Sequence, residues 1–100
     1  FIGAHMGGLC APFDEMCRYL VPRPNFYLDT SNAAHTLSQR EFIRLLAIHG
    51  PQHILFGTDW PWFPLGDEIK RIDRLLGLAG FGEKEKGAVF SGNLNALLRL

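Results

Sequence analysis

The sequence ILFGTDWPW, residues 54–62, joins a short apolar run to a glycine, a lone aspartate and a rigid Trp-Pro-Trp turn. A continuous run such as Ile-Leu-Phe is typical of a strand that is buried on both faces of a parallel sheet. Asp59 follows at the carboxyl end of this predicted strand. Placing a carboxylate there costs free energy unless it is paired or bound to a metal ion. The stretch therefore predicts a parallel α/β fold, in which Asp59 either caps a turn or belongs to a functional site.

Strand and helix patterns alternate along the whole chain. Strands are predicted at residues 1–4, 26–29 and 53–57, and amphipathic helices at residues 12–20, 38–49 and 67–76. Residues 30–36 are predicted to form a polar loop, and residues 83–90 and 93–98 two short helices separated by Ser91-Gly92. This order predicts three consecutive βα units with parallel strands and right-handed crossovers.

The predicted helices carry end signals and apolar stripes. Ser38 and Glu41 form a capping-box pair at the start of the second helix, and Gly50 followed by Pro51 marks its end. The stripes that should face the core follow helical spacing. They consist of Phe13, Met16, Cys17 and Leu20, of Phe42, Leu45 and Leu46, and of Ile69, Ile72, Leu75 and Leu76.

Composition excludes several classes of partner. The 100 residues suit one domain, and ten basic residues balance ten acidic ones, which favours neither nucleic acid nor an anionic membrane as a partner. No apolar run approaches the ~20 residues of a membrane span. Cys10 and Cys17 are too few for a disulfide framework, so we expect reduced thiols in a cytoplasmic protein, with one bond between them as the alternative. Phosphate-binding glycine loops and a GxSxG motif do not occur.

Polar side chains follow each predicted strand at its carboxyl end. His5 follows the first strand, Asp29 ends the second and Asp59 follows the third. The carboxyl ends of parallel strands share one edge of a sheet, and ligand sites of α/β folds gather there. Asp29 could instead accept backbone hydrogen bonds in its own loop. The topology therefore predicts a ligand-binding rim that includes these residues, although a histidine such as His5, taken alone, is more often structural.

Further residues are candidates for contact with a substrate at this rim. His35 lies in the predicted polar loop and either contacts substrate or is a solvated loop histidine. Trp60 and Trp62 form an apolar wall, either of a pocket or of ordinary packing. His49 lies near a helix end and His53 at the opposite end of its strand from the rim, so both are interpreted as structural.

Four segments of the chain resemble a known family. FIGAHMGG (1–8), NFYLDTS (25–31), ILFGTDWPW (54–62) and SGNLNALLRL (91–100) occur in the order expected for the C-terminal part of an amidohydrolase-related barrel. The chain is similar to the metal-dependent hydrolases and decarboxylases that include aminocarboxymuconate-semialdehyde decarboxylase. The resemblance implies a (β/α)8 barrel, of which residues 1–100 would supply strands six to eight as a single partial domain.

The resemblance also implies roles for site residues. Asp59 matches a metal-binding aspartate, and His5 matches a histidine that orients or activates a metal-bound water. The cofactor would be a divalent metal, with zinc expected, and Trp60, Trp62 and His35 would contact a small-molecule substrate. The family's HxH pair and its further histidine ligand do not occur in this chain. Activity would then require the missing barrel segment or a homo-oligomer.

The resemblance leaves the reaction open. We expect a hydrolase that acts on a small organic acid, lactone or amide through a metal-activated water. The alternatives are a metal-dependent decarboxylase, which is a lyase, and a non-catalytic α/β fragment that needs other chains.

Overall fold

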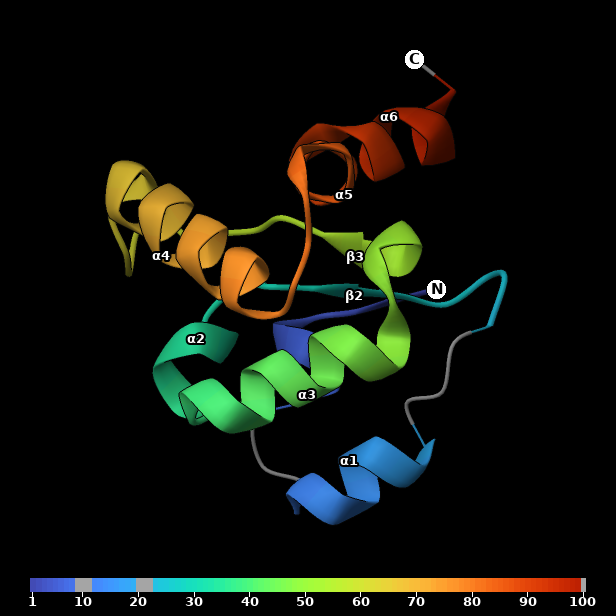
Figure 1. Ribbon diagram of the computed structural model, residues 1–100, viewed down its shortest axis with the longest axis vertical. Helices are drawn as coiled ribbons and strands as arrows, with labels where there is room; N and C mark the ends of the chain where they lie inside the picture. The colour runs from blue at the N-terminus through green and yellow to red at the C-terminus, as the bar shows by residue number, and fades with distance from the viewer. Residues whose placement is uncertain (9–11, 20–22, 100) are drawn as a thin grey trace.

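The computed structural model describes residues 1–8, 12–19 and 23–99. Three short strands, β1 (Ile2–Gly3), β2 (Tyr27–Asp29) and β3 (Ile54–Leu55), form a parallel sheet in the order β1-β2-β3. Ile2 pairs with Tyr27, and Leu28 pairs with Ile54. The predicted α/β class and parallel sheet are confirmed, and the sheet with its helices is consistent with consecutive βα units such as those of a (β/α)8 barrel (Figure 1).

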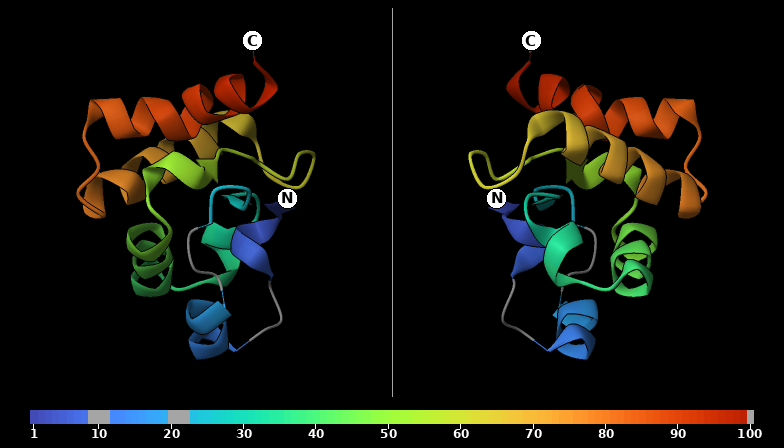
Figure 2. Two further views of the ribbon diagram at one scale, coloured as in Figure 1. Left: turned by 90° about the vertical axis from the view of Figure 1, so that its right-hand side faces the viewer. Right: turned by 90° about the vertical axis from the view of Figure 1, so that its left-hand side faces the viewer.

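The remaining elements are helical. They are η1 (His5–Gly7), α1 (Phe13–Tyr19), α2 (Ala33–Thr36), α3 (Gln39–His49), η2 (Pro51–His53), α4 (Leu65–Leu78), α5 (Glu83–Gly87), η3 (Ala88–Gly92) and α6 (Asn93–Leu98). Helix α1 lies at one end of the molecule, beyond α3, whereas α5 and α6 lie at the other end, beside β3 (Figures 1 and 2). None of the helices in the described part of the chain is long and apolar enough to cross a membrane.

Helix α3 forms where its end signals predict it. The Glu41 N–H donates to Ser38 Oγ over 3.1 Å, and the Ser38 N–H donates to Glu41 Oε1 over 2.9 Å, which completes the capping box. Gly50 ends the helix at a φ of 82°, a conformation that glycine adopts without a steric penalty.

The hydrophobic core lies between the sheet and the helices. Its buried members are Met6, Met16, Leu28, Ala33, Phe42, Leu45, Leu46, Ile54, Ile72, Leu75, Leu76 and Val89. Most of the predicted stripes are confirmed, while Leu20 lies outside the described residues. The prediction for Ile69 is wrong, because this side chain is 42% exposed. Glu68 takes the inward position at the start of α4 instead and is 1% exposed.

The structure corrects four of the predicted segments. Residues 30–36 were expected to be a loop, yet Ala33–Thr36 forms the single turn α2. Strand β3 is shorter than residues 53–57, and α4 is longer than residues 67–76. Ser91-Gly92 was expected to interrupt the last helices, but it belongs to the π-helical turn η3.

The π-helical turn is explained by its contacts with β3. Asn93 Nδ2 donates to the carbonyls of Pro51, over 2.6 Å, and Ile54, over 2.8 Å. The Phe56 N–H donates to the Val89 carbonyl over 3.1 Å. These bonds satisfy backbone groups of β3 and of the residues just before and after it, and buried backbone groups are costly when they lack a partner. A wide helical turn that passes Val89 and Asn93 along β3 is therefore favoured over a break at Gly92.

Candidate active site

At the predicted ligand-binding rim, hydrogen bonds connect His5, which follows β1, with the end of β2. Asp29 Oδ1 accepts hydrogen bonds from the backbone N–H groups of His5 (3.1 Å) and Ser31 (3.0 Å), and from the Ser31 hydroxyl. The His5 Nδ1 atom lies 2.7 Å from the Ser31 carbonyl oxygen and 2.9 Å from Ser31 Oγ. The prediction that Asp29 accepts backbone hydrogen bonds is confirmed. Asp29 also anchors the backbone of His5, whose φ is 56°.

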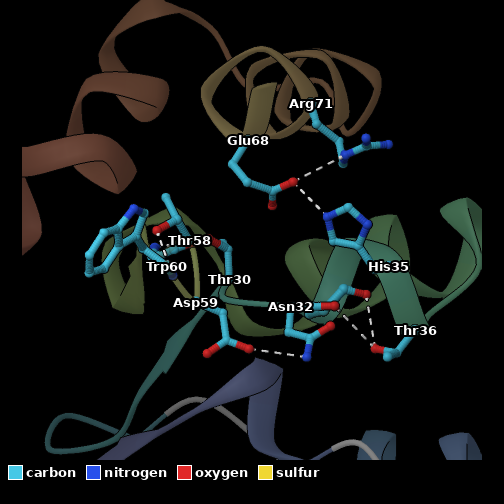
Figure 3. Close-up of polar contacts among 11 residues, drawn as sticks. Thr30, Asn32, His35, Thr36, Thr58, Asp59, Trp60, Glu68 and Arg71 are labelled. Carbon is cyan, nitrogen blue, oxygen red and sulfur yellow. Dashed lines mark hydrogen bonds and ion pairs between the residues drawn. The ribbon is translucent and has the colours of Figure 1, made fainter. Parts of the chain in front are cut away.

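Asp59 lies in the turn that follows β3 and also makes contact with the end of β2. Its carboxylate atom Oδ2 accepts a hydrogen bond from Asn32 Nδ2 over 3.1 Å, and the other carboxylate oxygen is turned away from Asn32 (Figure 3). Its carbonyl accepts from the Trp62 N–H over 3.0 Å. Asp59 and Asn32 have φ values of 60° and 59°, in the left-handed region where non-glycine residues are uncommon. The carboxylate is thus held by a side chain from another element and does not cap its own turn.

Two further contacts fix the segment that carries Asp59. The buried Thr30 hydroxyl donates to the Gly57 carbonyl and accepts from the Gly57 N–H, each over 3.1 Å. A Cβ atom at Gly57 would lie 3.3 Å from Ser31 Cβ, so glycine permits the close approach of β3 to the end of β2. At the other end of the turn, Phe63 stacks on the His35 ring with centroids 3.7 Å apart. The segment after β2 therefore contacts the loop at Gly57, Asp59 and Phe63.

His35 is held in place by a buried acid on α4. His35 Nε2 lies 2.6 Å from Glu68 Oε1, and Arg71 Nε donates to the same oxygen over 3.3 Å (Figure 3). The side chains of His35 and Glu68 are 24% and 1% exposed. Glu68 was not predicted from the sequence as a site residue. The available signal was its position on the helix, because residues 68, 72, 75 and 76 share one face.

The two tryptophans lie at the tip of the turn. Trp60 and Trp62 are each 76% exposed, and the Trp60 N–H donates to Thr58 Oγ1 over 3.2 Å. Within the described residues their rings lie on the surface, whereas Phe63 is half-buried. Their exposure leaves both rings accessible to a ligand, and their predicted contact with substrate stays a prediction.

Comparison with known proteins identifies the family. A family model described as amidohydrolase matches residues 1–100, which is the whole chain. The chain belongs to the amidohydrolase family. A search of curated proteins and a search of solved structures each found no match. The family supports a metal-dependent, hydrolase-type function in general terms.

An amidohydrolase generally requires a divalent metal ion, which is held by several protein side chains. Among residues 1–8, 12–19 and 23–99, no group of three or more His, Cys, Asp or Glu side chains could hold a metal ion. Catalytic zinc sites normally have three protein ligands. The chemistry of Asp59 fits one ligand position, since one carboxylate oxygen is held by Asn32 and the other is turned away. The described residues therefore do not complete a metal site by themselves.

Proposed function

We propose that this chain forms one side of the active site of a metal-dependent amidohydrolase that hydrolyses a small organic acid, lactone or amide. The observation that carries the proposal is the position of His5 and Asp59. Both follow strands of one parallel sheet, at its carboxyl edge, and both are held by polar groups from the segment after β2. Sites in α/β barrels lie at this edge.

Each residue of the proposed site has a separate role. Asp59 supplies one carboxylate ligand, and Asn32 fixes the orientation of that carboxylate through Oδ2. A divalent ion, when bound, lowers the pKa of its water toward ~7 and so supplies hydroxide at neutral pH. His5 presents an imidazole at the same rim, which is suited to hold or move a proton. Trp60, Trp62 and His35 would contact the substrate, and the exposure of both tryptophans supports this.

The site requires ligands beyond those of the described residues. We propose that residues 1–100 correspond to strands six to eight of the family barrel and that the remaining ligands come from the rest of a barrel or from a second subunit. We propose zinc as the metal and a cytoplasmic location.

Zinc binding and hydrolysis test the proposal. The purified chain is measured alone and after it is combined with a polypeptide that supplies the other barrel strands, with zinc determined by atomic absorption. We expect stoichiometric zinc and hydrolysis of lactone or amide substrates only in the combined protein. Asp59→Asn should weaken zinc binding by more than the ~10–100-fold typical of removing a group that only supports a ligand. Asn32→Ala, which removes such a supporting group, should fall within that range.

The matched control is Asp67→Asn, because Asp67 is an exposed acid in the first turn of α4. It should leave zinc binding and hydrolysis unchanged. Stoichiometric zinc in the Asp59→Asn protein would contradict the proposed ligand. Release of carbon dioxide from a carboxylated substrate, without hydrolysis, would establish the decarboxylase alternative instead.

A further inference from the structure

We infer that Asp29 and Ser31 are positioning residues that hold the proton of neutral His5 on Nδ1, leaving Nε2 as the unprotonated ring nitrogen. His5 Nδ1 lies 2.7 Å from the carbonyl oxygen of Ser31. A carbonyl oxygen only accepts hydrogen bonds. The proton of this contact must therefore be on Nδ1.

The Ser31 hydroxyl supports the same assignment. Its oxygen lies 2.9 Å from His5 Nδ1 and in close contact with Asp29 Oδ1. A hydroxyl has one proton, and an ionised carboxylate oxygen only accepts, so that proton points to Asp29. Ser31 Oγ then faces His5 with its lone pairs and acts as a second acceptor for the Nδ1 proton. Both contacts require the same tautomer.

Asp29 makes this arrangement rigid. Its Oδ1 atom receives the N–H groups of His5 and Ser31 as well as the Ser31 hydroxyl. The backbone of the histidine and both acceptors of its ring are therefore fixed by one carboxylate. Hydrogen bonds to a charged acceptor are about twice as strong as neutral ones. The ring nitrogen that bears the proton is set by the hydrogen bond the ring makes, so this network determines what the other nitrogen can do.

The tautomer decides what His5 Nε2 can do in a reaction. With the proton on Nδ1, Nε2 can accept a proton from water or a hydrogen bond from substrate, whereas the other tautomer could only donate from Nε2. The meaning of this inference for catalysis rests on the proposed function, in which His5 acts at the rim. The tautomer itself is independent of catalysis and can be measured without activity.

Long-range proton–nitrogen NMR correlation on the full ¹⁵N-labelled chain tests the inference, because it separates protonated from unprotonated imidazole nitrogens. Spectra are recorded at a pH where histidine side chains are neutral, and His5 is assigned by its loss in His5→Gln. We expect Nδ1 at the protonated position and Nε2 at the unprotonated position. In Asp29→Ala the signals should shift toward the Nε2–H tautomer, and in Ser31→Ala, which keeps the backbone carbonyl, by a smaller amount.

Thr36→Ala is the control, because it removes a hydroxyl that bonds only to backbone carbonyls near α2. Its His5 signals should match those of the unmodified chain. An Nε2–H tautomer in the unmodified chain would overturn the inference, as would unchanged signals in the folded variants. If Asp29→Ala does not fold, Ser31→Ala decides. An Nδ1–H tautomer in a chain that never supports hydrolysis would leave the inference standing while the proposed function fails.

Discussion

Replacing His35 with alanine should destabilise the protein through the loss of two defined contacts. The first is the 2.6 Å hydrogen bond to the buried Glu68 carboxylate, and hydrogen bonds to charged groups contribute ~1.5–3 kcal/mol. The second is the parallel stack on Phe63, with ring centroids 3.7 Å apart, and such pairs contribute ~0.5–1.5 kcal/mol. Solvent reaches the His35 side chain, which is 24% exposed, and Arg71 still bonds to Glu68 after the substitution. We therefore expect a loss of about 2–3 kcal/mol in the free energy of unfolding.

The matched control is His53→Ala. His53 is also a half-buried histidine beside an aromatic ring, with its centroid 5.1 Å from that of Tyr27. No ion pair to His53 occurs in the described part of the chain, so only its ring contacts with Tyr27 and, at a centroid distance of 6.1 Å, with His49 are lost, at ~0.5–1.5 kcal/mol. Urea denaturation should be followed by circular dichroism. Tryptophan fluorescence is the poorer probe because Trp60 and Trp62 are already exposed in the folded protein.

A double-mutant cycle identifies the interaction that is responsible. His35→Ala, Glu68→Ala and the double variant should give a coupling energy of at least ~1 kcal/mol, since the two side chains are in direct contact. A His35→Ala effect no larger than that of His53→Ala would refute the reasoning. A coupling energy near zero would do so as well, because the cost would then come from Phe63 alone.

Two further predictions concern stability, each checked by urea denaturation. Gly57→Ala should cost about 1–3 kcal/mol because the new methyl group would meet Ser31 Cβ at 3.3 Å. Gly66→Ala, in the exposed first turn of α4, meets nothing within 4 Å and should change stability by less than ~0.5 kcal/mol. Equal effects would be inconsistent with the close packing at Gly57. Asn93→Ala should cost about 2–3 kcal/mol, because it leaves the carbonyls of Pro51 and Ile54 without their donor. A change below ~0.5 kcal/mol would show that these bonds do not hold the start of α6 against η2 and β3.

The sequence predicted features that depend on local signals. The capping box at Ser38 forms as expected because it involves side chains three residues apart. The shared edge of His5, Asp29 and Asp59 also forms as expected, because strand ends in a parallel sheet are fixed by topology. Membership of the amidohydrolase family is confirmed by the match over the whole chain. The assigned roles of His5 and Asp59 stay predictions.

Features that depend on distant contacts were not predictable in this way. Glu68 shares the inward face of α4 with Ile72 and Leu76, but this spacing does not show what would pair a buried carboxylate. Its partner His35 lies 33 positions away in the chain. Asn93 follows Gly92, which local propensity interprets as a helix break, yet its bonds to Pro51 and Ile54 keep the helical turn. Tertiary contacts outweighed local preference at Asn93.

The segment after β2 has a central position in the proposed site. Ser31 contacts the ring of His5, and Asn32 contacts the carboxylate of Asp59, although these two groups follow different strands. Their relative position therefore depends on one short segment, which Asp29 and Thr30 fix at its start. Polar groups that are already oriented need no reorganisation when a ligand arrives.

The turn that carries Trp60 and Trp62 is exposed, unlike the hydrogen-bonded segment after β2. Trp60 and Trp62 present most of their surface to solvent, and exposed loops on a rigid scaffold commonly carry binding specificity. Substitutions at these two positions should therefore change which substrate binds without moving His5 or Asp59. Substitutions at Asp29 or Asn32 should disturb the group each one holds, whatever the substrate. Comparing substrate profiles of Trp62→Ala and Asn32→Ala in the combined protein separates the two roles. A uniform loss across substrates in Trp62→Ala would show that the turn supports the site and does not select the substrate.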